Sequence, residues 1–230
     1  MGSGDNRAGV NGRRAMTKHR RPAREPRALP VRLVPAGSQA LCLAYANSLC
    51  WRGLPKPTET LCGLTDLLAW CSNHGVVVDP AFVRWSLARP QAAQAVFAEA
   101  IAIRETLYRV LCALSIGARI ASADLRALND AMARTPPRTR IAELAQGYGW
   151  RLQAGGEAAY STATLLAAVL WSASDLIVGE HVASVRQCAN AACRWLFLDA
   201  SRSGSRRWCD MRSCGNRAKA RRHYHKHRAG

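Results

Sequence analysis

The chain has 230 residues, of which 49% are hydrophobic, and it carries a formal net charge of +18. It contains no apolar run of about 18 residues, which excludes an ordinary membrane-spanning helix. It also lacks a glycine-rich phosphate loop, a His-Glu-x-x-His motif and a nucleophile elbow, so an enzyme is the least favoured class of function.

The positive charge is concentrated at the two ends of the chain. Residues 1–34 hold nine Lys/Arg and two Asp/Glu. Residues 35–185 hold twelve Lys/Arg and eleven Asp/Glu, and residues 186–230 hold twelve Lys/Arg and two Asp/Glu. The near-neutral middle is typical of a globular domain. A basic excess confined to one module is the pattern expected when the partner is a polyanion.

Composition divides the chain into three regions. Residues 1–35 are basic, rich in Gly and Pro, and without apolar periodicity, so we expect them to be disordered, with Met16 as an alternative start. No apolar core follows this polar N-terminus, as a secretion signal would require. We expect a helical domain over residues 36–182 and a small zinc-bound module over residues 183–230.

Apolar residues recur at a spacing of three and four through the middle region, which predicts a mainly α fold with one hydrophobic core. Pro90 at a first turn and Gly117 after a last residue are typical helix boundaries. The glycine-rich segment 147–156 predicts the only strands outside the zinc module, as a small hairpin starting at Gly147. The helices are expected at residues 38–51, 58–73, 79–89, 90–116, 122–133 and 161–181.

Four cysteines near the C-terminus form two pairs with equal internal spacing: Cys188, Cys193, Cys209 and Cys214. Two Cys-x4-Cys pairs joined by a short connector are typical of the two halves of one tetrahedral zinc site, and a zinc ion held by four thiolates is structural. The alternatives are disulfides, which are uncommon without a secretion signal, and four unrelated buried thiols. The other cysteines occur singly among apolar residues and are interpreted as small buried hydrophobes: Cys42, Cys50, Cys62, Cys71 and Cys112.

The zinc module is too small to fold on apolar burial alone, so the metal must contribute to its folding. We expect a short strand over residues 195–198 and a basic helix from Cys209 to His227, since the latter segment is rich in Ala, Lys and Arg. In a complex with DNA, the cations of the helix would contact bases in the major groove, and the cations of the connector would contact phosphates. The candidate nucleic-acid-binding residues are Arg206, Arg207, Arg217, Lys219, Arg221 and Arg222.

The block from Cys188 to Arg217 ends in Cys214-Gly215-Asn216-Arg217 and resembles the CGNR zinc finger, which is named after those four residues. The preceding region resembles the ABATE domain that accompanies this finger in bacterial proteins. The similar stretches are residues 43–48, 51–53 and 104–109, although an aspartate usual in that family is replaced by Ala44. The resemblance implies a mostly helical N-terminal domain and a stress-associated transcription regulator.

A buried asparagine needs hydrogen-bond partners, so Asn47, on an apolar helix face, is either a structural residue or a ligand contact. The candidate pocket for a small-molecule effector consists of Asn47, Trp51, Arg52, Arg104 and Tyr108.

Three functions remain open from the sequence. The first is a DNA-binding transcriptional regulator, with a helical domain that senses an effector or forms a homodimer, working at the nucleoid in a bacterial cytoplasm. The second is an RNA-binding protein, which exposed aromatic side chains such as Trp195 or Tyr224 would favour. The third is a zinc-stabilised protein-interaction module. None of the three places the protein in a membrane.

Overall fold

The computed structural model describes residues 1, 41–144, 147–150, 152, 155–220 and 224. The expected disorder of residues 1–35 lies outside this part of the chain. Among the described residues, no helix combines the length and the apolar character needed to cross a bilayer. The α-helices of the middle region are α1 (Leu41–Ala46), α2 (Leu64–Asn73), α3 (Pro80–Ala88), α4 (Pro90–Ser115), α5 (Ser122–Ala133), α6 (Thr162–Leu165) and α7 (Ala167–Val178).

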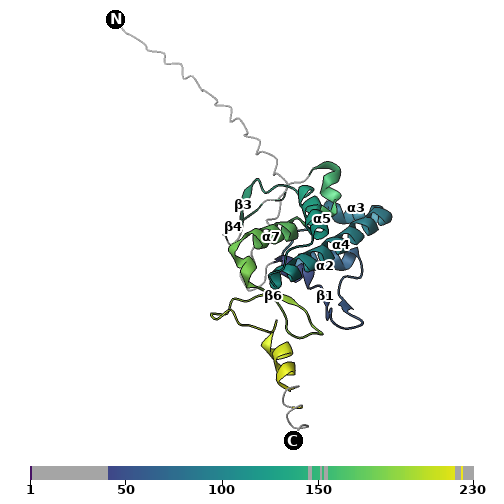
Figure 1. The fold of residues 1–230 in the computed structure, drawn as a ribbon. Helices are drawn as coiled ribbons and strands as arrows, with labels where there is room; N and C mark the ends of the chain where they lie inside the picture. The colour runs from purple at the N-terminus through teal and green to yellow at the C-terminus, as the bar shows by residue number, and fades with distance from the viewer. Residues whose placement is uncertain (2–40, 145–146, 151, 153–154, 221–223, 225–230) are drawn as a thin grey trace.

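The long helix α4 organises the helical domain, and α1, α2, α3 and α5 all contact it (Figure 1). Its sequence carries both expected boundaries, because Pro90 stands in the first turn and Gly117 has a φ of 68° beyond the last turn. Buried side chains such as Val96, Ala100 and Ile103 recur at a spacing of three and four and face the core. The predicted helical periodicity of this segment is therefore confirmed.

Three antiparallel strand pairs accompany the helices in the described part of the chain, and β1–β2 is a pair outside the zinc module that the sequence did not predict. β1 (Leu49–Cys50) pairs with β2 (Thr58–Glu59), and β3 (Ile141–Leu144) pairs with β4 (Gly147–Trp150). β5 (Val185–Gln187) pairs with β6 (Leu196–Leu198) at the start of the cysteine-rich module. The mainly α fold with a small C-terminal cysteine cluster agrees with the prediction.

Two helix boundaries near the N-terminal side differ from the prediction. The first helix ends at Ala46 rather than at residue 51, because the chain turns into β1 and Trp51 takes a φ of 55° that a helix does not allow. The second helix begins at Leu64 rather than at residue 58, because Thr58 and the next residue form β2.

Two later elements are also displaced. The hairpin begins at Ile141, so Gly147 starts its second strand rather than its first. The last core helix is divided at Leu166 into α6 and α7, with the Ser161 hydroxyl capping the backbone N–H of Thr164 at 3.2 Å.

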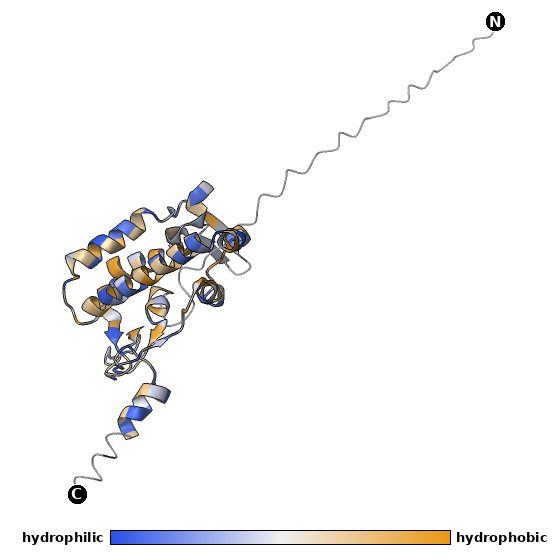
Figure 2. Ribbon diagram, turned by 90° about the vertical axis from the view of Figure 1, so that its right-hand side faces the viewer, coloured by the Kyte–Doolittle hydropathy of each residue, from blue (hydrophilic) through white to orange (hydrophobic). Residues whose placement is uncertain are grey.

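The cysteine-rich module lies at one end of the helical domain, and the helical segment over residues 216–220 points away from it (Figure 1). The perpendicular view in Figure 2 shows the same arrangement, with hydrophilic residues prominent on that segment. Val185 and Leu196, on β5 and β6, are fully buried in the hydrophobic core that α1, α4 and α7 share. The core therefore continues across residue 183, where the sequence predicts a domain boundary.

Candidate metal centre and nucleic-acid interface

The four predicted ligand cysteines come together in one cluster. Cys188 follows β5, Cys193 precedes β6, and Cys214 lies in a π-helical turn (Met211–Gly215). All four sulfur atoms lie within 4.8 Å of one another, and Cys209 Sγ is 3.7 Å from Cys193 Sγ and 3.8 Å from Cys214 Sγ. A regular ZnS4 tetrahedron with bonds of about 2.3 Å has S···S edges of about 3.8 Å, so the cluster fits one structural zinc ion.

Backbone and side-chain hydrogen bonds hold the sulfur atoms in place. The Cys188 N–H donates to Trp195 O at 2.7 Å, and the Cys193 N–H donates to Asn190 O at 2.8 Å. The buried Asn190 also directs its Nδ2 towards Cys214 Sγ at 3.4 Å. Hydrogen bonds from Cys193 and Cys209 lower the pKa of the Cys188 thiol, and the same contacts raise the pKa values of the two donor thiols. Zinc binding would release these protons, because the metal takes each cysteine as a thiolate.

The connector between the cysteine pairs is fixed by a buried carboxylate. Asp199 Oδ1 accepts from the Ser201 N–H at 3.0 Å and from its hydroxyl at 2.5 Å, while Oδ2 accepts from the Arg206 N–H at 2.8 Å. These bonds, led by the one from the Ser201 hydroxyl, lower the pKa of Asp199. The carboxylate therefore stays ionised and closes the loop between residues 199 and 206.

The candidate DNA-binding cations differ in how exposed their side chains are. Arg207, Arg217 and Lys219 are exposed. Arg206 is half-buried: its guanidinium donates to Trp208 O at 2.8 Å and to Cys209 O, and lies 4.7 Å from the centre of the Phe197 ring. Its side chain thus supports the module. The predicted cations at residues 221 and 222 lie outside the described residues.

Arg212 is an exposed cation that the sequence analysis did not single out. It lies between Cys209 and Cys214, in the turn that opens the helical segment. Its position inside the second cysteine pair was the available signal, because a residue between two ligands of one metal must lie close to the metal centre.

Two family models match the chain. Residues 184–227 match the CGNR zinc finger. Residues 39–180, more than half of the chain, match the ABATE family, described as a putative stress-induced transcription regulator. The chain belongs to the ABATE family. The order of the two matches, with the ABATE domain N-terminal to the CGNR finger, confirms the resemblance found in the sequence. A search of curated proteins found no match.

Asn47 of the ABATE domain is bound to the backbone of the CGNR finger. Its side-chain Nδ2 donates to Leu196 O at 2.8 Å, and its Oδ1 accepts from the Leu196 N–H at 3.0 Å. Asn47 is 3% exposed and Leu196 is fully buried. The amide group therefore replaces a missing strand neighbour for the edge of β6, and it joins two parts of the chain separated by 149 residues.

The adjoining loop of Trp51, Arg52 and Gly53 also docks on the finger. The Gly53 N–H donates to Ala192 O at 3.1 Å. A Cβ atom at Gly53 would lie 1.7 Å from Ala191 O, so only glycine allows this approach. In the other direction, the Arg217 guanidinium of the finger lies 4.7 Å from the centre of the Trp51 ring.

The remaining predicted pocket residues form an ion-pair network beneath this loop. Arg104, which is 2% exposed, binds both carboxylate oxygens of Glu59 at 2.6 and 2.7 Å and contacts Glu105 at 2.9 Å. Arg52 binds Glu105 at 2.6 and 3.0 Å. Burial acts to raise the pKa values of Glu59 and Glu105, but their arginine partners outweigh it and leave both pKa values lowered.

Tyr108 completes the contact between the ABATE domain and the CGNR finger. Its hydroxyl donates to Arg194 O at 2.9 Å and accepts from Gln187 Nε2 at 3.2 Å, and the Arg52 guanidinium lies 3.7 Å from the centre of its ring. The five residues of the predicted pocket thus lie together, with their polar groups bonded mainly to the protein itself. Effector binding by these residues stays a prediction.

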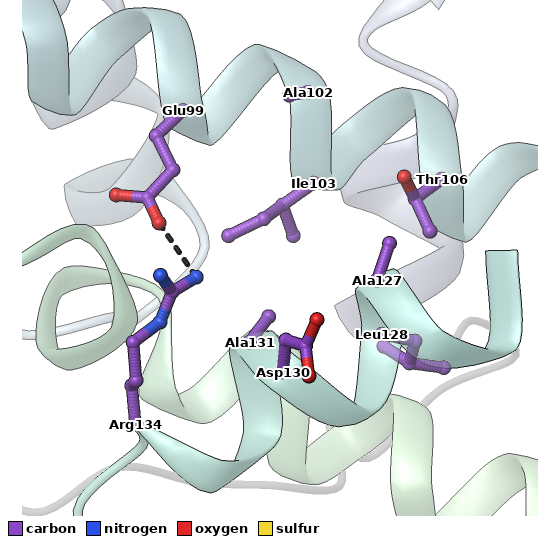
Figure 3. A pocket seen from close by; sticks show the side chains of 9 residues that line it. All are labelled: Glu99, Ala102, Ile103, Thr106, Ala127, Leu128, Asp130, Ala131 and Arg134. Carbon is purple, nitrogen blue, oxygen red and sulfur yellow. Dashed lines mark ion pairs between the residues drawn. The ribbon is translucent and has the colours of Figure 1, made fainter. Parts of the chain in front are cut away.

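A separate pocket lies between α4 and α5 and is lined by none of the five predicted residues, although Arg104 and Tyr108 belong to the same helix α4 (Figure 3). It has a volume of about 250 Å³, and an ion pair of 2.7 Å between Glu99 and Arg134 crosses it. A second ion pair between these two helices joins Arg109 and Asp124 at 2.7 Å.

The remaining cysteines are less uniform than predicted. Cys42 and Cys71 are fully buried, and burial raises their pKa values to about 11 and about 12. Cys50 and Cys112 are half-buried, and Cys62 is exposed. The expectation of a buried thiol is wrong for Cys62, because the loop before α2 leaves it at the surface.

Proposed function

We propose that this protein is a zinc-dependent, DNA-binding transcriptional regulator of the bacterial cytoplasm, bound at the nucleoid. In this proposal the CGNR finger binds DNA, and the ABATE domain senses an effector or forms a homodimer. The observation that carries the proposal is a set of exposed cations on a module that the metal centre holds in one conformation: Arg207, Arg212, Arg217 and Lys219.

The arrangement of these cations fits a duplex partner. Cys214 lies in the turn that leads directly into the helical segment 216–220, so metal binding fixes where that segment begins. Arg217 and Lys219 are exposed and flank Ala218, which is buried. The segment can therefore present its cations to a groove while Arg207, on the connector, contacts phosphate.

The contact between the two domains supports a regulatory role for the ABATE domain. Asn47, Gly53 and Tyr108 hold the finger in one orientation relative to the helices. An effector or a second subunit bound to the ABATE domain could act on DNA binding only through such a fixed contact. A homodimer would bind two half-sites with the spacing that this orientation sets.

The test is selection of sequences from a random pool of duplex DNA by the full-length zinc-loaded protein, repeated over a range of salt concentrations. Cys209→Ser is the test variant, and Cys62→Ser, at an exposed thiol away from the metal centre, is its matched control. We expect one enriched motif with the wild type and the control, and none with Cys209→Ser. Enrichment that survives Cys209→Ser, or no motif with any of the three proteins, would refute zinc-dependent sequence recognition.

RNA is a second candidate partner, and one observation favours it. Tyr224, near the C-terminus, is 55% exposed, as a side chain that stacks on a base would be. Trp195, the other aromatic residue considered for this role, is half-buried. Competition between duplex DNA and structured RNA of the same length, in the same salt, distinguishes the two candidates. Tighter binding of RNA than of duplex DNA would indicate that RNA is the partner of the finger.

A further inference from the structure

A pocket opens between the ABATE domain and the CGNR finger, beside the metal centre. It has a volume of about 250 Å³ and is mainly apolar. The cysteines Cys193, Cys209 and Cys214 belong to its lining, so the zinc site adjoins the pocket. A single ion fills only a small part of this volume. The rest of the wall is formed by Cys50, Trp51, Trp195, Asp210 and Ser213.

Backbone strain is concentrated at this pocket. Among the described residues, Trp51 and Arg194 are the non-glycine residues with positive φ, and both have a φ of 55°. Trp51 lines the pocket directly, and Arg194 precedes Trp195, which lines it too. A left-handed backbone at a non-glycine residue is costly and persists where the surroundings require it, often at binding sites. Here it sets the positions of the two indole rings.

The polar groups at this pocket suit a nucleotide. The Arg217 guanidinium lies over the Trp51 ring at 4.7 Å, which places a fixed cation beside the pocket for a phosphate. Asp210 lines the pocket with an exposed carboxylate, one oxygen of which accepts from the Ser213 N–H at 2.8 Å. A carboxylate has about four acceptor positions, so Asp210 can also accept from an exocyclic amino group, which cytosine, adenine and guanine carry and thymine and uracil lack.

We propose that this pocket binds one unpaired nucleobase, stacked on Trp51 or Trp195, with a preference for bases that carry an exocyclic amino group over thymine and uracil. The inference rests on the proposed binding of nucleic acid by the finger. The base pocket goes beyond that proposed function in one respect, because the ABATE domain supplies Trp51. The site is therefore complete only where both domains meet. Stacking on aromatic side chains is the usual means by which proteins hold unpaired bases, and it tolerates either sugar.

The experiment uses the full-length zinc-loaded protein and labelled single strands of oligo-dC, oligo-dA and oligo-dT, with the matching RNA strands and a duplex of the same length. Trp51→Leu removes the ring while keeping an apolar side chain. Trp85→Leu is the matched control, because Trp85 stacks on Tyr160 in the helical domain and lines no part of this pocket. Affinity and quenching of tryptophan fluorescence are both measured.

We expect oligo-dC or oligo-dA to bind more tightly than oligo-dT and to quench tryptophan fluorescence. Trp51→Leu should weaken single-strand binding by roughly 5- to 150-fold, the range of one base–aromatic stack. Its effect on duplex binding should be smaller, because there it removes only the contact between the Trp51 ring and Arg217. Trp85→Leu should change neither. Asp210→Asn, which keeps a helix-capping side chain, should reduce the difference between the bases.

The outcomes separate this inference from the proposed function. Duplex binding without quenching, with Trp51→Leu equal to the control on every strand, would overturn the base pocket and leave the regulator proposal intact. Absence of binding to every nucleic acid at low salt would overturn both. Equal affinity for oligo-dC, oligo-dA and oligo-dT would refute the role of Asp210. Tighter binding of RNA than of DNA strands would assign the base to RNA.

Discussion

Replacing Asn47 by alanine tests whether the ABATE domain and the CGNR finger form one folding unit. The side-chain amide of Asn47 satisfies both the N–H and the C=O of Leu196, and both residues are buried. Truncation would leave two buried backbone groups unpaired, each at a cost of about 1–3 kcal/mol. The expected loss is therefore about 2–6 kcal/mol, a large share of the roughly 5–15 kcal/mol of a typical domain.

Urea unfolding followed by far-ultraviolet circular dichroism measures this loss, because the signal comes mainly from the helices of the ABATE domain. The matched control is Asn129→Ala, at an exposed position of α5, which should change the free energy of unfolding by no more than about 0.5 kcal/mol. The decisive comparison repeats both titrations with a zinc chelator. Chelation should lower the midpoint of the wild type and of the control, and lower that of Asn47→Ala much less.

Two results would refute this reasoning. A loss below about 1 kcal/mol for Asn47→Ala would mean that water replaces the amide at the edge of β6. A helical unfolding transition that chelation leaves unchanged in the wild type would mean that the finger and the helices fold independently, despite their shared core.

Three further predictions concern the same contact and the metal centre. Gly53→Ala should weaken the docking of the finger, because its Cβ would overlap Ala191 O; faster proteolysis of the finger with zinc bound is the measurement. Stability should fall in acid: the lowered pKa values of Glu59 and Glu105 give stabilisation that is present above their ordinary value of 4.5 and lost as the pH falls through the lower folded values. Replacing both glutamates by glutamine should flatten that part of the stability–pH curve. Finally, metal analysis should find one zinc per chain in the wild type and well under one in Cys209→Ser, while equal zinc content would contradict the four-thiolate centre.

Local sequence patterns were sufficient where local physics decides the structure. The spacing of the four cysteines predicts the metal centre, because ligand spacing is set by the geometry of two short loops. Pro90 and Gly117 mark the ends of α4, because both act on their own backbone. The fold class followed from the same periodicity, without any information on how the helices pack.

Long-range contacts explain what the sequence alone did not show. Asn47 stood out as a buried polar residue, but its partner, Leu196, lies 149 residues away and is a backbone group that no side-chain pattern marks. Glu59 belongs to a strand rather than to the expected helix, and its carboxylate binds the buried Arg104. The sequence suggested that Arg206 binds nucleic acid, whereas in the structure its guanidinium donates hydrogen bonds to backbone carbonyl groups of the finger itself.

The shared core has a consequence for exchange of parts between related proteins. A finger moved onto another ABATE domain would bring the apolar side chains of Val185 and Leu196, which need a matching cavity, and an unpaired strand edge, which needs an amide in the place of Asn47. It would also need a glycine in the place of Gly53. Chimeras that keep the two halves from one parent, or that transfer these positions together with the finger, are therefore the ones expected to fold.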